Sequence, residues 1–185
     1  MKRQPSLRLI QGDVGSGKTV IAALASVHAF GNNFQTALMA PTELLAEQHF
    51  INLSNWLAPL GIKTAWLSGR VTGKKRHEEL SRILSGDAAV IIGTHALFQK
   101  DVEFRNLGLV IVDEQHKFGV HQRLALREKG SAGSTSPHQL VMTATPIPRT
   151  LSMSMYADMD VSVIDELPPG RTPVTTTVMS DEKRD

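Results

Sequence analysis

Cysteine is missing from the chain, although the chain runs to 185 residues. Its absence excludes disulfide bonds, thiolate catalysis, and zinc or iron–sulfur centres held by cysteine, and it is compatible with a reducing cytosol. Aromatic residues are scarce at 5%, with two Trp and one Tyr. The core must therefore be mostly aliphatic, which suits strands that are buried on both faces of a parallel sheet.

Long hydrophobic runs and a strong charge of one sign are missing as well. No apolar stretch approaches the ~20 residues that span a membrane, and the basic residues 1–5 are not followed by the apolar core of a signal peptide. The net charge of +2 does not by itself mark a nucleic-acid binder. Residues 1–100, however, carry 11 basic and 6 acidic side chains, whereas residues 101–185 carry 9 and 12. This asymmetry permits one face to attract an anion.

What the chain does contain is a regular alternation of apolar strands and helical segments, within a length typical of one domain. Strands are expected over residues 7–11, 36–40, 62–67, 88–92, 109–112 and 139–143. Helices are expected over residues 20–30, 43–57 and 74–84, with a further one beginning near Arg149. This alternation predicts an α/β fold, with a mostly parallel central sheet and helices on both faces. In the second helix, a stripe at helical spacing is expected to face the core: Leu44, Leu45, His49, Leu53 and Trp56.

A phosphate-binding loop is the strongest local signal. Residues 12–19 match the pattern G-x4-G-K-[ST] in full, between a predicted strand and a predicted helix. Its glycines let the backbone wrap closely, so that consecutive N–H groups and the helix amino terminus point at a phosphate. The predicted ATP-binding residues are Gly12, Asp13, Val14, Gly15, Ser16, Gly17, Lys18 and Thr19. Lys18 is expected to reach the β- and γ-phosphates, and the Thr19 hydroxyl to hold Mg²⁺. A dinucleotide fingerprint is excluded because its second glycine would fall on Val14.

Two carboxylates follow the most apolar strand. Residues 109–112 lead directly into Asp113 and Glu114. Ligands bind at the carboxyl ends of strands in sheets of this type, so both side chains are expected beside the phosphate loop. Asp113 is placed to hold Mg²⁺ through water, and Glu114 to orient or activate the attacking water. Together with the loop, these carboxylates predict an ATP hydrolase.

The order of these segments resembles the first motor domain of a DExH-type helicase of superfamily 2. The phosphate loop and Asp113-Glu114-Gln115-His116 carry the resemblance. Three more segments match in the expected order: residues 40–49 resemble motif Ia, 93–97 motif Ib and 143–146 motif III. Three stretches are similar to the RecG family of bacterial branched-DNA helicases: residues 113–123, 143–150 and 165–172. The resemblance covers about residues 7–178 and implies a RecA-like P-loop NTPase domain.

The resemblance implies a bacterial, cytoplasmic motor that couples ATP hydrolysis to movement on DNA without sequence preference. Such a motor remodels stalled forks and Holliday junctions in DNA repair and recombination. The implied catalytic residues are Lys18, Asp113, Glu114, Gln115 and His116. The residues implied along the DNA are Pro41, Thr42, Glu43, Ser68, Gly69, Arg70, Thr94 and His95. Gln115 and His116 would connect the γ-phosphate site to motif III. The residues that would relay the nucleotide state to the DNA are Thr143, Ala144 and Thr145.

A cluster of basic residues begins after the second predicted helix and continues through the third, over residues 63–82. Its members are Lys63, Arg70, Lys74, Lys75, Arg76 and Arg82, opposed in the same stretch by Glu78 and Glu79. Such a cluster adds a salt-dependent affinity for nucleic-acid phosphates. It is equally typical of a solvated helix face, and the sequence leaves both interpretations open.

The expected organisation is an ATP-binding domain over residues 1–167, followed by a linker and the start of a second motor domain over residues 168–185. The resemblance implies that the second motor domain completes the ATP site with transition-state arginines. It also implies that a wedge domain of the same protein contacts the DNA, and no membrane partner is expected. This chain alone is therefore expected to bind ATP with Mg²⁺ but to be nearly inactive in hydrolysis.

Three other functions fit parts of the pattern. A transcription-repair coupling translocase of the Mfd type has a similar motif order, although it usually carries a glutamate at the position of Gln115. A nucleotide-dependent binding module that never hydrolyses ATP would have no need for the carboxylate of Glu114. A small-molecule P-loop kinase would leave motif Ia and residues 143–145 without a role.

Overall fold

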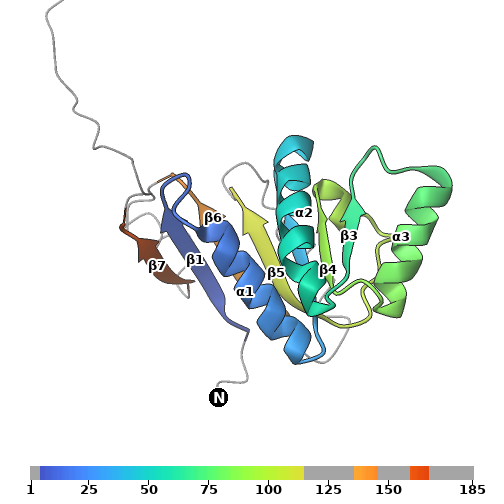
Figure 1. The fold of residues 1–185 in the computed structure, drawn as a ribbon, viewed down its shortest axis with the longest axis horizontal. Helices are drawn as coiled ribbons and strands as arrows, with labels where there is room; N and C mark the ends of the chain where they lie inside the picture. Colours follow the sequence, from blue (N-terminus) through green and yellow to red (C-terminus); the bar gives the residue numbers. More distant parts are fainter. Residues whose placement is uncertain (1–4, 115–135, 146–158, 167–185) are drawn as a thin grey trace, which may run out of the picture.

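The fold is built on a parallel sheet. A computed structural model describes residues 5–114, 136–145 and 159–166, and Figure 1 shows how their elements are arranged. Every described strand pair is parallel, and the seven strands lie in the order β3-β4-β2-β5-β6-β1-β7. The strands are β1 (Leu7–Gly12), β2 (Gln35–Met39), β3 (Thr64–Leu67), β4 (Val90–Gly93), β5 (Leu107–Asp113), β6 (His138–Thr143) and β7 (Met159–Ile164). The first six confirm the strands expected from the sequence.

The three predicted helices within the described residues are also present. They are α1 (Lys18–Gly31), α2 (Glu43–Leu57) and α3 (Gly73–Ser85), with short 3-10 turns η1 (Ala58–Leu60) and η2 (His95–Phe98). Thr42 begins α2 as its N-cap, because its hydroxyl accepts a hydrogen bond from the N–H of Leu45. Gly86 ends α3 in a left-handed conformation with φ 79°, a common helix C-terminal signal.

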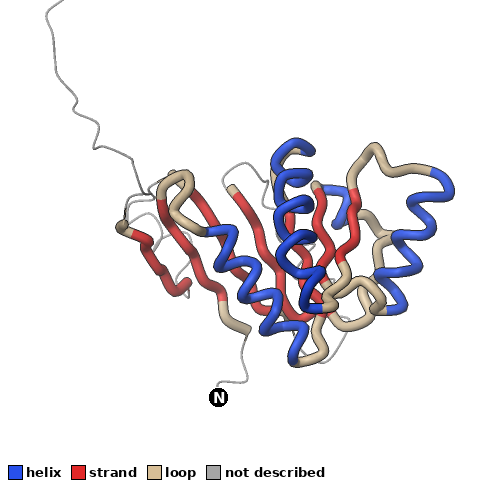
Figure 2. The backbone as a smooth tube through the Cα atoms, viewed as in Figure 1, coloured by secondary structure: helices blue, strands red, loops and turns tan. Residues whose placement is uncertain are grey.

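Two apolar clusters lie on opposite faces of the sheet, because successive side chains of a strand point to opposite sides. On β5, Ile111 belongs to one cluster and Val110 to the other. Helices α1 and α2 cover the first face, the latter through Leu53, and Figures 1 and 2 show both helices running along that side. Helix α3 and the η2 turn cover the second face through Ile83 and Leu97. The predicted α/β architecture, with helices on both faces of a parallel sheet, is confirmed.

The predicted core stripe of α2 is wrong at its two ends. Leu44 is 67% exposed and Trp56 is 44% exposed. His49 and Leu53 of that stripe are buried as predicted, and the other buried residues of the helix are Ala46 and Leu57. These four also follow helical spacing, and the small side chain of Ala46 permits the helix to pack closely on the sheet. The predicted stripe of large apolar residues therefore coincides only in part with the buried face of α2.

Strand β7 was not expected from the sequence. It pairs with β1 along its whole length, ending with Ile164 beside Gly12. Only half of its side chains are partly buried, so the apolar run that signals a central strand is missing. The expected helix near Arg149 and the expected segment 168–185 lie outside the described residues. Within the described residues, no helix combines the length and apolar character needed to cross a bilayer.

At the amino ends of the strands, Gln35 joins three backbone segments. Its side-chain Nε2 donates to the carbonyl oxygens of Ile83 and Ala88, at 2.8 Å each. Its Oε1 accepts a hydrogen bond of 3.0 Å from the backbone N–H of Asn106. Gln35 is only 4% exposed, and its side chain satisfies the buried carbonyl of Ala88 and the N–H of Asn106. The Ile83 carbonyl also accepts a hydrogen bond from the N–H of Gly86.

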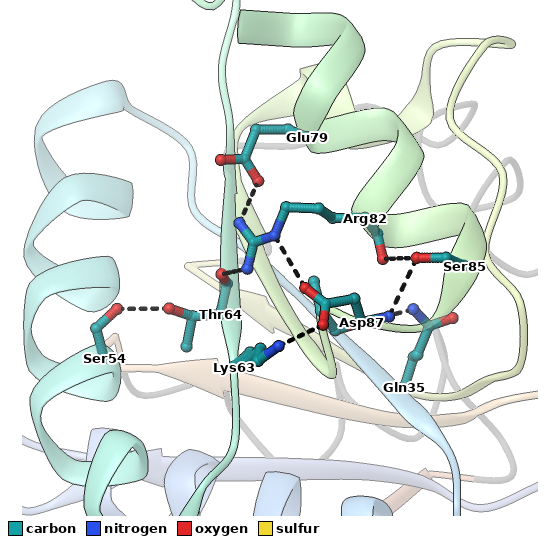
Figure 3. A network of polar contacts seen from close by, with 9 residues as sticks. Gln35, Ser54, Lys63, Thr64, Glu79, Arg82, Ser85 and Asp87 are labelled. Carbon is teal, nitrogen blue, oxygen red and sulfur yellow. Dashed lines mark hydrogen bonds and ion pairs between the residues drawn. The ribbon is translucent and has the colours of Figure 1, made fainter.

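A network of charged side chains surrounds the same end of the sheet (Figure 3). Arg82 donates to the carbonyl oxygen of Thr64 at 2.9 Å and to the carboxylates of Glu79 and Asp87 at 2.9 and 3.2 Å. Lys63 pairs with Asp87 from the other side, at 2.5 Å. Hydrogen bonds from Lys63, and to a smaller extent from Arg82, hold the pKa of the Asp87 carboxyl below its ordinary value. The network ties α3 to strands β3 and β4.

Candidate nucleotide-binding and nucleic-acid site

The predicted motifs meet at the other edge of the sheet, where the strands end. The phosphate loop follows β1, motif Ia follows β2 and motif Ib follows β4. Asp113 ends β5, and Thr143 ends the neighbouring strand β6. Ligands of parallel α/β sheets bind at this carboxyl edge. The fold therefore places at one edge segments that are far apart in the sequence.

The phosphate loop has the backbone geometry that its glycines predict. Gly15 and Gly17 have φ values of 83° and 95°, in the left-handed region that glycine enters most easily. The N–H of Ser16 donates to the carbonyl oxygen of Asp13 at 3.1 Å, which closes the turn. Gly17 is the N-cap of α1 and supplies no side-chain cap, and the first helical turn contains no acidic residue. The amino terminus of α1 is thus suited to an anion.

Lys18 folds over this loop. Its ammonium donates to the carbonyl oxygens of Gly12 and Asp13, at 2.7 Å each. The hydroxyl oxygen of Ser16 is buried and has no hydrogen-bond partner among the described residues. A Cβ on Gly12 would lie 2.6 Å from that oxygen and 3.0 Å from the Cβ of Ile164. The loop therefore combines the ammonium of Lys18, the Ser16 hydroxyl without a described partner, and a position at Gly12 that requires glycine. These features fit a bound phosphate group.

Asp113 is held by a residue that the sequence did not single out for the site. Its Oδ2 lies 2.7 Å from Nε2 of His49, and both side chains are about nine-tenths buried, at 11% and 10% exposed. Within the described residues, Oδ1 of Asp113 makes no hydrogen bond. His49 was expected to be part of the core stripe. The available signal was its polarity on the buried face of α2, since a buried polar side chain requires a partner.

Glu114 joins the acidic strand end to motif III. Its carboxylate accepts hydrogen bonds from the N–H of Ala144 at 3.1 Å and from the hydroxyl of Thr143 at 3.2 Å. The N–H of Thr145 donates to the same hydroxyl at 3.1 Å. Glu114 also has a φ of 51°, which is uncommon for a residue with a side chain and occurs often at functional sites. Gln115 and His116, also predicted here, lie outside the described residues.

Three of the eight residues predicted to follow the DNA, Glu43, Ser68 and Arg70, line a cleft of about 310 Å³. The other five are not among its lining residues: Pro41, Thr42, Gly69, Thr94 and His95. The lining residues come from the start of α2 and from residues 66–75, and they are Glu43, Glu47, Trp66, Ser68, Arg70, Val71, Thr72 and Lys75. Arg70 pairs with Glu43 across the cleft at 2.7 Å. Ser68 and Thr94 are buried, at 2% exposed each, whereas Gly69, Arg70 and His95 are exposed. This cleft is separate from the phosphate loop and brings motif Ia together with Ser68 and Arg70.

The predicted basic cluster is largely engaged in ion pairs. Its pairs are Lys63 with Asp87, Arg70 with Glu43, Lys74 with Glu78, Arg76 with Asp101, and Arg82 with Glu79 and Asp87. The expectation that only Glu78 and Glu79 oppose the cluster is therefore wrong. Asp87 follows α3 closely, and Glu43 and Asp101 come from distant parts of the sequence. Lys75 makes no ion pair with a described residue and lines the cleft. Most of this charge is therefore balanced by nearby carboxylates.

Comparisons with known proteins agree with this geometry. A family model described as DEAD/DEAH box helicase matches residues 5–154. The chain is 62% identical over 184 residues to the ATP-dependent DNA helicase RecG of Haemophilus influenzae, and 63% identical over 180 residues to that of Escherichia coli strain K12. These alignments cover 100% and 97% of this chain but 27% and 26% of the relatives, so the chain spans about a quarter of their length.

Solved structures show the same similarity. The structure of RecG bound to a three-way DNA junction matches 94% of this chain and 22% of that chain, with a TM-score of 0.77 and 45% identity. The DNA-bound helicase MrfA shares the fold, with a TM-score of 0.67 at 18% identity. The predicted resemblance to RecG and the RecA-like fold are confirmed. With the family model matching residues 5–154, the chain belongs to the DEAD/DEAH box helicase family.

Proposed function

We propose that this chain is the ATP-binding half of a helicase motor that uses ATP hydrolysis to remodel branched DNA. The observation that carries the proposal is the joining of three motifs at one edge of the sheet. The phosphate loop follows β1, and the carboxylate of Glu114 accepts hydrogen bonds from Thr143 and Ala144 of motif III. A nucleotide-dependent movement of Glu114 would therefore reach motif III directly.

The residues of the loop bind and orient the triphosphate. Lys18 exchanges its two carbonyl partners for phosphate oxygens, and the N–H groups at the start of α1 donate to the same anion. Thr19 and Asp113 would hold Mg²⁺, and the buried carboxylate of Asp113 fits this role because it keeps one oxygen without a described partner. When bound, Mg²⁺ neutralises charge on the phosphate oxygens. Glu114 orients the attacking water and accepts its proton.

DNA is the proposed partner, recognised without sequence preference through its backbone. The support is the cleft beside α2, which Glu43 at the start of the helix lines together with Ser68 and Arg70. Small polar groups and backbone N–H groups of this kind suit phosphate contacts. The similarity to RecG, whose solved structure contains a three-way junction, supports branched DNA as the substrate and a role in repair and recombination. We place this activity in the bacterial cytoplasm.

The proposed organisation has residues 1–167 as the ATP-binding domain and residues 168–185 as a linker into a second motor domain. The relatives are about four times as long as this chain, which leaves room for a second motor domain and a wedge domain. A transition-state arginine from outside the ATP-binding domain contributes about 10³–10⁵ in rate in phosphoryl transfer. This chain alone would therefore bind ATP but hydrolyse it slowly.

The site is tested by titrating a fluorescent ATP analogue into the chain in the presence of Mg²⁺. Lys18→Ala should weaken binding at least about tenfold, because each charge-assisted hydrogen bond contributes about 1.5–3 kcal/mol. Lys63→Ala is the matched control, since Lys63 is exposed at the opposite edge of the sheet. Failure of the unchanged chain to bind at millimolar concentration would contradict the nucleotide site. Brisk DNA-stimulated hydrolysis by the chain alone would contradict only the expected low turnover.

A further inference from the structure

His49 is the one polar residue among the buried residues of α2, which are otherwise Ala46, Leu53 and Leu57. Its imidazole contacts Oδ2 of Asp113 at 2.7 Å, and the contact joins two residues 64 positions apart. An apolar side chain would have satisfied the packing requirement without placing a polar group in the core. The chain instead keeps a polar pair at the point where α2 passes the end of β5.

We propose that His49 is a positioning residue that fixes the carboxylate of Asp113 for Mg²⁺ bound with the nucleotide. An ionised carboxylate only accepts hydrogen bonds, so Nε2 of His49 is the donor in this pair. The bond occupies Oδ2 and leaves Oδ1, which has no described partner, for the metal and its water. This inference rests on the proposed nucleotide site.

Burial holds the side chains of His49 and Asp113 in a fixed relative orientation. The imidazole is held by the packed face of α2, and Asp113 is fixed by β5, whose neighbours on both sides are paired strands. A carboxylate that must rotate before it binds a metal loses affinity, and outer partners that orient metal ligands typically contribute a factor of about 10–100 in metal affinity. His49 would provide this orientation from a helix whose amino end carries motif Ia.

The test measures how strongly Mg²⁺ improves nucleotide binding, without any hydrolysis. The fluorescent analogue mant-AMPPNP is titrated into the chain in EDTA and again in excess Mg²⁺, and the ratio of the two dissociation constants is the metal-linked gain. His49→Leu should reduce this gain about tenfold, with the dissociation constant in EDTA unchanged. His49→Gln should restore most of the gain, because its amide N–H reaches the position of Nε2. His28→Leu is the matched control, on an exposed position of α1.

Several results would overturn the inference. One is a metal-linked gain in His49→Leu equal to that of the unchanged chain. Another is an equal weakening of binding in EDTA and in Mg²⁺, which would indicate a purely structural role. If His49→Leu does not fold, His49→Gln is compared with His49→Asn, whose shorter amide cannot reach Asp113, and equal gains in both would refute the proposal.

Failure of the proposed function can be told apart from failure of this inference. A chain that binds no nucleotide at all would refute the proposed function. Nucleotide binding without any metal-linked gain would refute the role of the His49–Asp113 pair alone.

Discussion

Near the amino ends of the strands, Gln35 and Asp87 each bind several partners, although the buried hydroxyl of Thr36 in β2 has no described partner. At the carboxyl ends, the buried hydroxyls of Ser16 and Thr94 have no described partner. The two edges thus differ in degree: the charged network lies at the amino ends, whereas the predicted binding motifs and the uncommon backbone conformation of Glu114 lie at the carboxyl ends.

This difference has a physical cause in the parallel sheet. Both edges contain strand ends whose backbone groups need partners, yet only the carboxyl edge has the amino terminus of α1 pointing toward it. Groups that must bind a ligand cannot all be satisfied by the protein itself. Strain and missing partners are therefore expected at the carboxyl edge, where binding a ligand would compensate for them. Mutations at the two edges should accordingly separate activity from stability.

The largest expected effect is on activity at the carboxyl edge. Glu114→Gln should lower ATP hydrolysis by the complete motor about 10²–10⁴-fold, the usual contribution of a positioned general base. Nucleotide affinity should be nearly unchanged, because Glu114 is proposed to contact water. A steady-state ATPase assay with DNA measures the loss, with Glu78→Gln on the exposed side of α3 as the control. Equal turnover in Glu114→Gln and the unchanged motor would exclude a catalytic role for this carboxylate.

The next largest effect is on stability at the amino edge. Gln35→Ala should lower the free energy of unfolding by about 2–4 kcal/mol, because it leaves the carbonyl of Ala88 and the N–H of Asn106 unsatisfied at about 1–3 kcal/mol each. Urea unfolding followed by circular dichroism measures the change, and Gln48→Ala is the control at an exposed position of α2. Nucleotide affinity under stabilising conditions should be retained. A loss of nucleotide affinity without a loss of unfolding free energy would contradict the conclusion that Gln35 serves the stability of the fold.

A smaller effect on stability is expected at the phosphate loop. Gly17 has a φ of 95°, and a Cβ there would meet no atom within 4 Å, so the penalty of Gly17→Ala is purely conformational. It should lower the free energy of unfolding by about 1–2 kcal/mol and weaken ATP binding more strongly. Gly31→Ala is the matched control, since that glycine has open space and no positive φ. Thermal unfolding and nucleotide titration together would show whether Gly17 serves binding more than stability.

The smallest effect concerns pH. The pKa of Asp87 is lowered in the folded chain by Lys63 and Arg82, so its ion pairs stabilise the fold at pH values above the ordinary value of 3.8. The contribution of these ion pairs to stability is lost as the pH falls from 3.8 through the lower pKa that Asp87 has in the folded chain. Asp87→Asn should therefore flatten the decline of stability at acid pH, with little change in nucleotide binding. Urea unfolding at several pH values measures this slope, and an unchanged slope would contradict the role of the pair.

Much of the fold was predictable because its signals are local. The apolar run before Asp113 predicted a buried central strand, and the loop glycines predicted the turn into α1, both as observed. Thr42 at the start of α2 is a typical capping residue and behaves as one. Strand β7 was missed because an edge strand with partly exposed side chains has no continuous apolar run.

The buried face of α2 was not predictable, because helical spacing alone accommodates more than one stripe. Large side chains favoured a stripe that ran from Leu44 to Trp56, but packing on the sheet buries Ala46 and Leu57 in place of these two ends. Close approach of a helix to a sheet depends on the shape of both surfaces, which periodicity does not contain. The role of the basic cluster was undecided for a related reason, since two of its acidic partners, Glu43 and Asp101, lie elsewhere in the chain.

The sequence by itself determined the order of strands and helices, the phosphate loop and the position of the acidic pair at a strand end. Only the tertiary structure decided which polar groups meet there. Asp113 and His49 are 64 positions apart, and Glu114 and Ala144 are 30 apart. Local sequence patterns indicate which segments form helices, strands and turns. These contacts instead depend on the order in which the strands pair in the sheet.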